Sequence, residues 1–229
     1  IRALAVALSR RLRMLDGLRA AGCAVESGAP CMAPLRMRKS AAELALMQRA
    51  FDMTLAVQRA AASVLREGIT TTEVQDFIDA AHRRVSGAGS SFCIVLFGVA
   101  SSFPHGVSEP QVLQHGDVVL IDTGCYVQGY SSDLTRSYVY GRADEDVRRI
   151  WAVEKAAQAA AFAAARLGAP CSGVDAAARA VLQAHGLGPG YALPGLPHRT
   201  GHGIGLDIHE GPYLVGGDER LQVPRRSEP

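Results

Sequence analysis

The sequence predicts an α+β protein in which helices cover one face of a mostly antiparallel sheet. Two helical segments precede a group of strand-like segments, and the same order occurs a second time along the chain. With 229 residues, of which 48% are hydrophobic, the chain is long enough to bury a substantial core. We expect one large domain over residues 36–229, preceded by a short separate segment over residues 1–35.

Residues 1–35 combine a helical pattern with a Gly/Pro/Ala-rich stretch, residues 28–34, that indicates a linker. The apolar run from Leu4 to Leu8 is too short for a secretion signal and is followed by three arginines, so an amphipathic helix is favoured over an Arg-rich transit peptide. No apolar run approaches the roughly 20 residues of a membrane span. The chain opens with Ile1 rather than Met, which suggests a fragment or a processed product.

Two helices are predicted before the first strand. Ser40 and Glu43 have the spacing of a capping box, and apolar residues then recur at helical intervals up to Gly68. After a threonine-rich loop, Thr72 and Gln75 can cap a second helix, which should end at the next glycine.

Strands and a second pair of helices follow. β-Branched and aromatic residues predict strands at residues 92–97, 117–122, 126–130 and 133–140. An alanine-rich helix is predicted over residues 144–167, and another over residues 174–185. Gly- and Pro-rich residues then lead into a final strand-and-turn region.

A weak internal repeat links the two helical pairs. The segments Arg66-Glu67-Gly68 and Arg166-Leu167-Gly168, 100 residues apart, occupy the same place in a helix–loop–helix unit. Either a duplicated half-domain or a coincidence among common residues explains the match, because it rests on few positions.

Composition and charge narrow the function classes. The 24 Lys and Arg residues nearly balance the 22 Asp and Glu residues, and a net charge of +2 argues against nucleic acid as the principal partner. The five cysteines are far apart and form no C-x-x-C pair, which argues against a disulfide framework and against a zinc knuckle. A reducing, cytoplasmic compartment is the simpler interpretation.

Two aspartates form the first candidate site. Asp122 ends an apolar strand, and Asp133 follows eleven residues later, beyond a turn. If the flanking strands form a hairpin, both carboxylates reach one site and offer hard oxygen ligands to a divalent ion. Taken alone, the pair is better explained by one turn aspartate and one partner for Arg136, because Asp is common near turns.

Three of the seven histidines, His198, His202 and His209, fall within twelve residues and alternate with glycines that allow close approach of a ligand. Imidazoles suit metal binding and acid–base chemistry, so this concentration favours a functional site. His105 lies in a loop between two predicted strands, and its position alone does not indicate a function. The remaining histidines are predicted to be structural: His82, His115 and His185.

Four motifs stand in this order along the chain: Asp122-Thr123-Gly124, residues 129–136, residues 200–205 and Ile208-His209-Glu210. Together they resemble the signature of the pita-bread metallopeptidases, which include methionine aminopeptidase, prolidase, aminopeptidase P and creatinase. Pro104-His105-Gly106 and the segment at residues 35–44 resemble the X-Pro branch more than the methionine branch. The resemblance covers about residues 36–215 and implies the pita-bread fold, a curved and mostly antiparallel sheet with helices on one face.

The resemblance also implies a function. Asp122 and Asp133 match the ligands of two divalent metal ions, Mn in the first place, with Co, Zn or Fe as alternatives, and His202 matches a ligand of the second ion. His105, His198 and His209 match positions that orient the substrate and stabilise the tetrahedral intermediate. The implied enzyme is a homodimeric metallo-exopeptidase of the prolidase or aminopeptidase P type, which hydrolyses X-Pro bonds in short peptides with proline at the second position.

The family pattern includes two further carboxylates, one in a Glu-Pro motif and one that bridges the metals near the C-terminus. Glu228-Pro229 resembles the first motif, although it lies closer to His202 than in the family, so Glu228 is a candidate metal ligand. The bridging glutamate has no counterpart. We therefore expect a pita-bread domain that is truncated at both ends and lacks its last strands, a remnant of an N-terminal domain in residues 1–35, and impaired activity.

Two alternatives stay open. Relatives of this fold can lose the metal and act as catalytically inactive peptide-binding proteins, and creatinase-like chemistry uses the fold without metal. The complete set of Asp122, Asp133 and His202 argues against both, because neither has a physical need for these three side chains together.

Overall fold

The computed structural model describes residues 13–103 and 105–217, and the chain divides into two compact units, Ile1–Leu35 and Arg36–Pro229. Helix α2 (Ala29–Met37) covers most of the Gly/Pro/Ala-rich stretch at residues 28–34, so this stretch is helical and not an irregular loop. Pro34 lies inside α2, beyond its first turn, where a proline removes one helical hydrogen bond. Within the described residues, no helix has the length and apolar character needed to cross a membrane.

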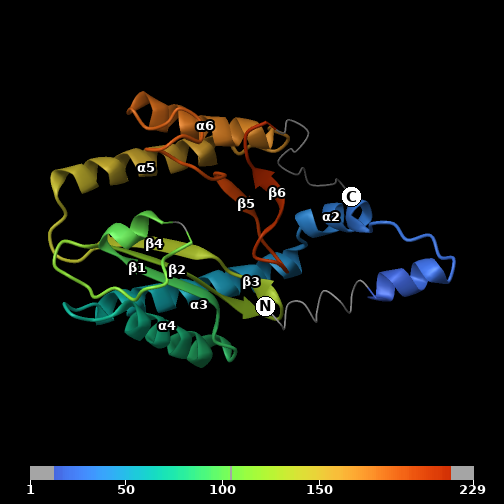
Figure 1. The fold of residues 1–229 in the computed structure, drawn as a ribbon, viewed down its shortest axis with the longest axis horizontal. Coiled ribbons are helices and arrows are strands. Elements are labelled where there is room, and N and C mark those ends of the chain that lie inside the picture. Colours follow the sequence, from blue (N-terminus) through green and yellow to red (C-terminus); the bar gives the residue numbers. More distant parts are fainter. Residues whose placement is uncertain (1–12, 104, 218–229) are drawn as a thin grey trace. The chain divides into compact units, whose positions relative to one another are not determined.

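The larger unit contains a four-stranded sheet (Figure 1). Its strands are β1 (Ser90–Phe97), β2 (Val118–Val127), β3 (Tyr130–Ser131) and β4 (Leu134–Val139). The long strand β2 pairs antiparallel with each of the other three. The predicted α+β class with an antiparallel sheet is therefore confirmed.

The strand predicted over residues 126–130 is wrong. Its first two residues extend β2, and the chain then turns at Gln128 and Gly129, whose φ angles are 49° and 87°. Positive φ at both turn residues matches the twist of a tight hairpin. Tyr126 consequently pairs with Ser131, and β2 continues directly into β3.

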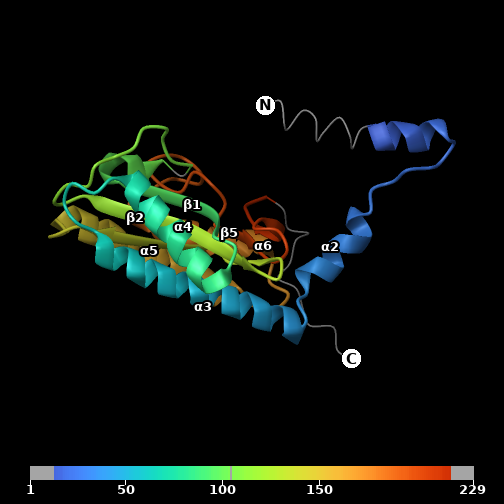
Figure 2. The same cartoon turned by 90° about the horizontal axis from the view of Figure 1, so that it is seen from below.

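Helices α3 (Ala41–Val64) and α4 (Thr71–Ser86) lie along one face of this sheet (Figures 1 and 2). The predicted capping box of α3 is confirmed, because the Ser40 hydroxyl accepts from the Glu43 amide and the Glu43 carboxylate accepts from the Ser40 amide. Glu43 thereby contributes a charge at the positive end of the helix.

The predicted cap of α4 is wrong by two residues. Thr70, not Thr72, has the extended conformation of an N-cap, and it forms a capping box with Glu73. Thr72 already lies inside the helix, so its backbone cannot adopt the conformation that a cap requires. The helix ends as predicted at Gly87, whose φ is 82°.

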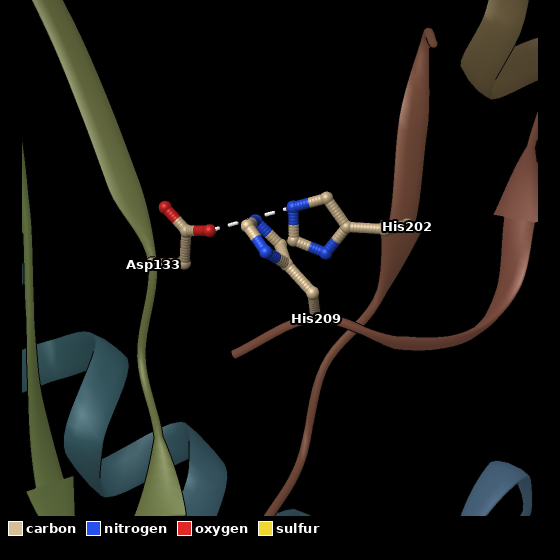
Figure 3. A group of neighbouring side chains, drawn as sticks. All are labelled: Asp133, His202 and His209. Carbon is tan, nitrogen blue, oxygen red and sulfur yellow. Dashed lines mark ion pairs between the residues drawn. The ribbon is translucent and has the colours of Figure 1, made fainter. Parts of the chain in front are cut away.

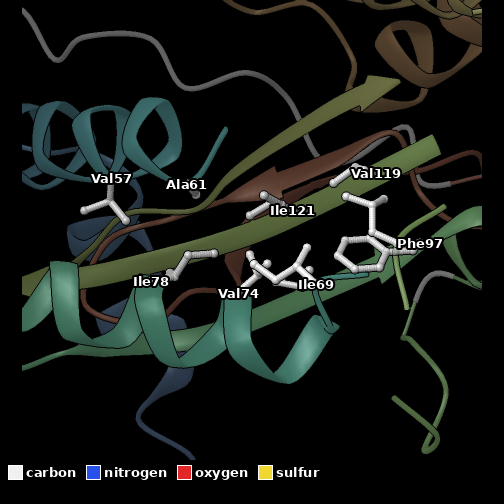
Figure 4. Close-up of a cluster of buried hydrophobic side chains, with 10 residues drawn as sticks. Val57, Ala61, Ile69, Val74, Ile78, Phe97, Val119 and Ile121 are labelled. Carbon is white, nitrogen blue, oxygen red and sulfur yellow. The ribbon is translucent and has the colours of Figure 1, made fainter. Parts of the chain in front are cut away.

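The core lies between these helices and the sheet (Figure 4). It consists of ten buried side chains: Val57, Ala61, Ile69, Val74, Ile78, Val95, Phe97, Leu113, Val119 and Ile121. Side chains alternate between the two faces of a strand, so burial of Val119 and Ile121 directs Asp122 to the opposite face. The core thus fixes where this carboxylate points.

A second pair of helices, α5 (Glu145–Ala164) and α6 (Cys171–Ala184), packs side by side through small residues such as Ala157 and Ala178. A two-stranded antiparallel sheet of β5 (Gly201–Gly203) and β6 (Glu210–Leu214) follows, with β6 against α6. These elements carry the histidine-rich segment of the sequence.

The two helical pairs are connected in the same way. α3 and α5 end 100 residues apart, at Val64 and Ala164, and α4 and α6 begin 100 residues apart. Gly68 and Gly168, in the middle of the two loops, have φ angles of 84° and 81°. The shared backbone conformation favours a duplicated unit over a coincidence.

Candidate metal centre

Asp133, His202 and His209 converge on one place in the larger unit (Figure 3). One ligand atom from each lies within 4.8 Å of the others. Nε2 of His202 is 3.5 Å from Oδ2 of Asp133, and the ring centroids of His202 and His209 are 4.3 Å apart. A carboxylate and two imidazoles at these separations can share one cation.

The link between β3 and β4 positions Asp133. The preceding residue, Ser132, is fully buried, and its Oγ accepts from the amide of Cys125 at 2.9 Å and lies 2.7 Å from Oγ1 of Thr54. A Cβ at Gly124 would collide with the carbonyl oxygen of Ser132. The glycine of Asp122-Thr123-Gly124 is therefore required by the close approach of the chain that carries Asp133.

The β5–β6 sheet positions the histidines. His202 lies in β5, and His209 directly precedes β6. The register shifts next to Gly203, where a Cβ would meet the carbonyl oxygens of Glu210 and Gly211. Nδ1 of His202 is 2.9 Å from the carbonyl oxygen of Gly203, so a neutral ring that donates this proton presents an unprotonated Nε2 to Asp133.

Asp122 adds a second carboxylate. Its Oδ1 atom is buried and has no hydrogen-bond partner among the described residues. Burial, followed by the negative charge of Asp133, raises the pKa of Asp122 to about 6. Two mutually repelling carboxylates, one with a buried unsatisfied oxygen, are unfavourable by themselves. The chemistry of these donors therefore fits a bound divalent cation.

The pKa of His209 is lowered. Desolvation is the largest cause, followed by electrostatic interactions with His202 and Arg199, and an interaction with His105 acts in the same direction. His209 is consequently neutral at pH 7 and able to accept or donate one hydrogen bond. The effect of His105 places it within electrostatic reach of the cluster.

His198 and Glu228 are the remaining predicted site residues. His198 is exposed, and its Nδ1 is 2.8 Å from the carbonyl oxygen of Arg199, so the structure does not bring this side chain into the cluster. Glu228 lies outside the described residues. Of the predicted residues, the structure thus assembles two aspartates and two histidines, with His105 nearby.

Sequence reasoning assigned no role to Glu210, which directly follows His209. This buried carboxylate accepts hydrogen bonds from Arg36 Nη2 and from Lys39 Nζ, both at 2.6 Å. It anchors the end of the histidine segment to the residues that precede α3. The sequence signal for this role was an acidic residue that begins an otherwise apolar strand and directly follows a candidate histidine.

Residues 45–225 match the sequence profile of metallopeptidase family M24. The chain belongs to this family. Relatives in M24 include the probable dipeptidase PepE of Mycobacterium tuberculosis, 38% identical over 191 residues, with 83% of this chain and 50% of the relative covered. Xaa-Pro dipeptidase of Pyrococcus furiosus is 31% identical over 188 residues, with 82% of this chain and 53% of the relative covered.

A solved M24 structure, the prolidase of Thermococcus sibiricus, superposes with a TM-score of 0.83 at 30% identity and covers 93% of this chain and 57% of that chain. The predicted pita-bread fold is therefore confirmed. M24 is a family of metallopeptidases, in agreement with the donor set of the cluster. This chain spans about half the length of the curated relatives it matches.

Proposed function

We propose that this chain is part of an exopeptidase that hydrolyses X-Pro peptide bonds with the help of two divalent metal ions. The observation that carries the proposal is the buried, unpartnered carboxylate oxygen of Asp122 beside Asp133, His202 and His209. The names of two similar proteins, Xaa-Pro dipeptidase and prolidase, support the choice of substrate. Membership of the M24 family supports the reaction class.

Asp122, Asp133 and His202 would hold the metal, and Glu228 is a further candidate ligand. Carboxylate and imidazole donors suit Mn, Co, Fe and Zn, and we favour Mn. When bound, such ions lower the pKa of a coordinated water, so that hydroxide is available near neutral pH to attack a carbonyl carbon.

The remaining residues act on the peptide. Neutral His209 is able to donate a hydrogen bond to the oxygen on which negative charge develops during the attack. His105 and His198 are assigned to orientation of the substrate. A proline at the second position has no N–H and a fixed φ, so a peptide bond before proline needs a site of its own.

The decisive experiment is a metal titration of this chain. The melting temperature should rise with Mn²⁺ or Co²⁺, and isothermal titration should give the stoichiometry. A peptide-binding protein without a metal site would show no shift with any of Mn²⁺, Co²⁺, Fe²⁺ and Zn²⁺, and that result would exclude the proposal. Release of the first residue from X-Pro dipeptides then measures activity.

Two further properties are proposed from the sequence alone. The resemblance supports a homodimer, and the odd number and wide spacing of the five cysteines support a cytoplasmic location. Light scattering coupled to size exclusion measures the first, and fractionation of the source cells measures the second.

A further inference from the structure

A long segment without helix or strand connects α6 to β5, between Ala184 and Gly201. It carries His198 and leads directly to His202. Loops of this length in a compact domain are uncommon and need contacts from elsewhere to hold one conformation.

An ion pair on α6 supplies those contacts. Asp175 and Arg179 lie one helical turn apart, and both are buried, with exposed fractions of 1% and 8%. Nε of Arg179 donates to Oδ2 of Asp175 at 2.8 Å, and Nη2 donates to Oδ1 at 3.1 Å. The guanidinium is thus fixed against the helix by a two-point contact.

The other donors of Arg179 all reach the connecting segment. Nη1 donates to the carbonyl oxygens of Gly190 at 2.7 Å and Leu196 at 2.6 Å, and Nη2 donates to that of His198 at 2.6 Å. Together with the two bonds to Asp175, these contacts occupy all five N–H groups of the guanidinium. A lysine has three donors and no planar fork, so it cannot reproduce this set.

Asp175 holds the same segment with its remaining acceptor positions. Oδ1 accepts from the hydroxyl of Thr200 at 2.7 Å, and Oδ2 accepts from the hydroxyl of Tyr191 at 2.9 Å. The ring of Tyr191 also lies under the guanidinium of Arg179, 3.5 Å from its centre. Thr200 is two residues before His202, and its amide donates to Leu214 of β6.

We propose that the Asp175–Arg179 pair positions His198 and His202, and that it does so by fixing the backbone of residues 190–200. The pair contacts neither the cluster nor the proposed metal, so its members are positioning residues. A buried ion pair is weak evidence for stability, but its saturated contacts to one segment specify a single path for that segment. The expected effect on metal affinity rests on the proposed function, whereas the positioning of the two histidines does not.

The test compares Arg179→Lys with the matched control Arg83→Lys. Arg83 also pairs with an aspartate one turn away, Asp79, but its side chain is 67% exposed and lies on α4. Two readouts are used: the imidazole resonances of metal-free protein with ring-labelled histidine, and the visible absorption of Co²⁺ titrated into the same samples. Histidine signals are assigned from His198→Gln and His202→Gln.

We expect Arg179→Lys to keep the circular dichroism of the folded protein but to shift and broaden the signals of His198 and His202. Co²⁺ affinity should fall about tenfold, with an altered absorption band, as for other changes behind a ligand. Arg83→Lys should change neither readout. Unchanged histidine signals in a folded Arg179→Lys protein would overturn the proposal.

Two milder variants keep the test decisive if Arg179→Lys does not fold. Thr200→Val and Tyr191→Phe each remove one hydrogen bond to Asp175 and leave the ion pair in place. Smaller shifts of His198 and His202 in the same direction are expected, and their absence in both variants would also refute the proposal. If the unmodified chain binds none of Mn²⁺, Co²⁺, Fe²⁺ and Zn²⁺, the proposed function fails, whereas the metal-free spectra still decide this inference.

Discussion

The carboxylate of Asp133, in the link between β3 and β4, lies 3.5 Å from Nε2 of His202, which belongs to β5 of a different sheet. The buried hydrogen bond between Ser132 and Thr54 fixes the backbone next to Asp133, and the pairing of β5 with β6 fixes His202. Neither sheet contains the whole donor set. The candidate metal centre therefore depends on how these two sheets are held together.

Asp133→Asn should remove the stabilisation by metal. An amide carries no charge to offset a divalent cation, so metal affinity should fall at least about tenfold. At a free metal concentration about 100 times Kd, binding stabilises the unmodified chain by about 2.7 kcal/mol, which melting curves detect. Asp52→Asn, an exposed change on α3, is the control. Equal metal-induced shifts in both variants would contradict a role of Asp133 as ligand.

The metal-free protein should lose stability as the pH rises through 6. Burial, with the charge of Asp133, raises the pKa of Asp122 to about 6, so the folded chain binds this proton more tightly than the unfolded chain. The stabilisation is complete below the ordinary pKa of about 4 and is lost above 6.

The variant Asp122→Asn isolates this effect. Its free energy of unfolding should lack that decline, by about 1 kcal/mol after allowance for partial exposure, in urea titrations between pH 4 and 8. Histidines titrate in both proteins, so the difference between the two curves is the quantity to measure. Parallel curves would show that Asp122 is not perturbed.

Gln58→Ala should destabilise the fold. The side chain is buried, with 1% exposed, and its amide donates to the carbonyl oxygens of Ile121 at 3.0 Å and Leu134 at 2.8 Å. Loss of both bonds and a cavity should cost roughly 2–4 kcal/mol of unfolding free energy in urea. Gln48→Ala, at an exposed position of the same helix, should cost less than about 0.5 kcal/mol. Similar costs at the two positions would refute the importance of these contacts.

Glu210→Ala should remove the carboxylate that Arg36 and Lys39 share. Lys39 is mostly buried, with 11% of its side chain exposed, whereas Arg36 keeps a contact with Asp207. Because an unpaired buried charge is costly, we expect a loss of roughly 2–4 kcal/mol in unfolding free energy. Asp146→Ala breaks an exposed pair with Arg149 and serves as the control, with a loss of less than about 0.5 kcal/mol. A loss at Glu210 no larger than in the control would contradict its anchoring role.

Local patterns predicted much of the fold. The start of α3 was predictable because Ser40 and Glu43 exchange hydrogen bonds between side chain and backbone within four residues. Strand β2 was predictable because a buried strand is a continuous apolar run. The four residues gathered at the candidate site were selected by their residue types and by the family resemblance. Their convergence is a property of the sheets that sequence spacing alone does not give.

Contacts between distant segments decided the remainder. Thr70 with Glu73 and Thr72 with Gln75 both have cap spacing, but the amide of Thr71 donates to the carbonyl of Gln111, which fixes the chain before the helix. The partners of Arg179 are backbone carbonyls, and a carbonyl has no residue-specific signal in a sequence. A charged pair within the apolar stripe of α6 was the only local indication.

The origin of the donor groups in two sheets has a mechanical consequence. A cation bound to Asp133 and His202 would cross-link the hairpin of β5 and β6 to the sheet around β2, much as a disulfide joins two strands. Removal of the cation by a chelator would then separate the β5–β6 hairpin from the larger sheet before the core unfolds. Proteases should consequently nick the metal-free protein near residue 204, between the two histidine-bearing stretches, while the helices remain intact.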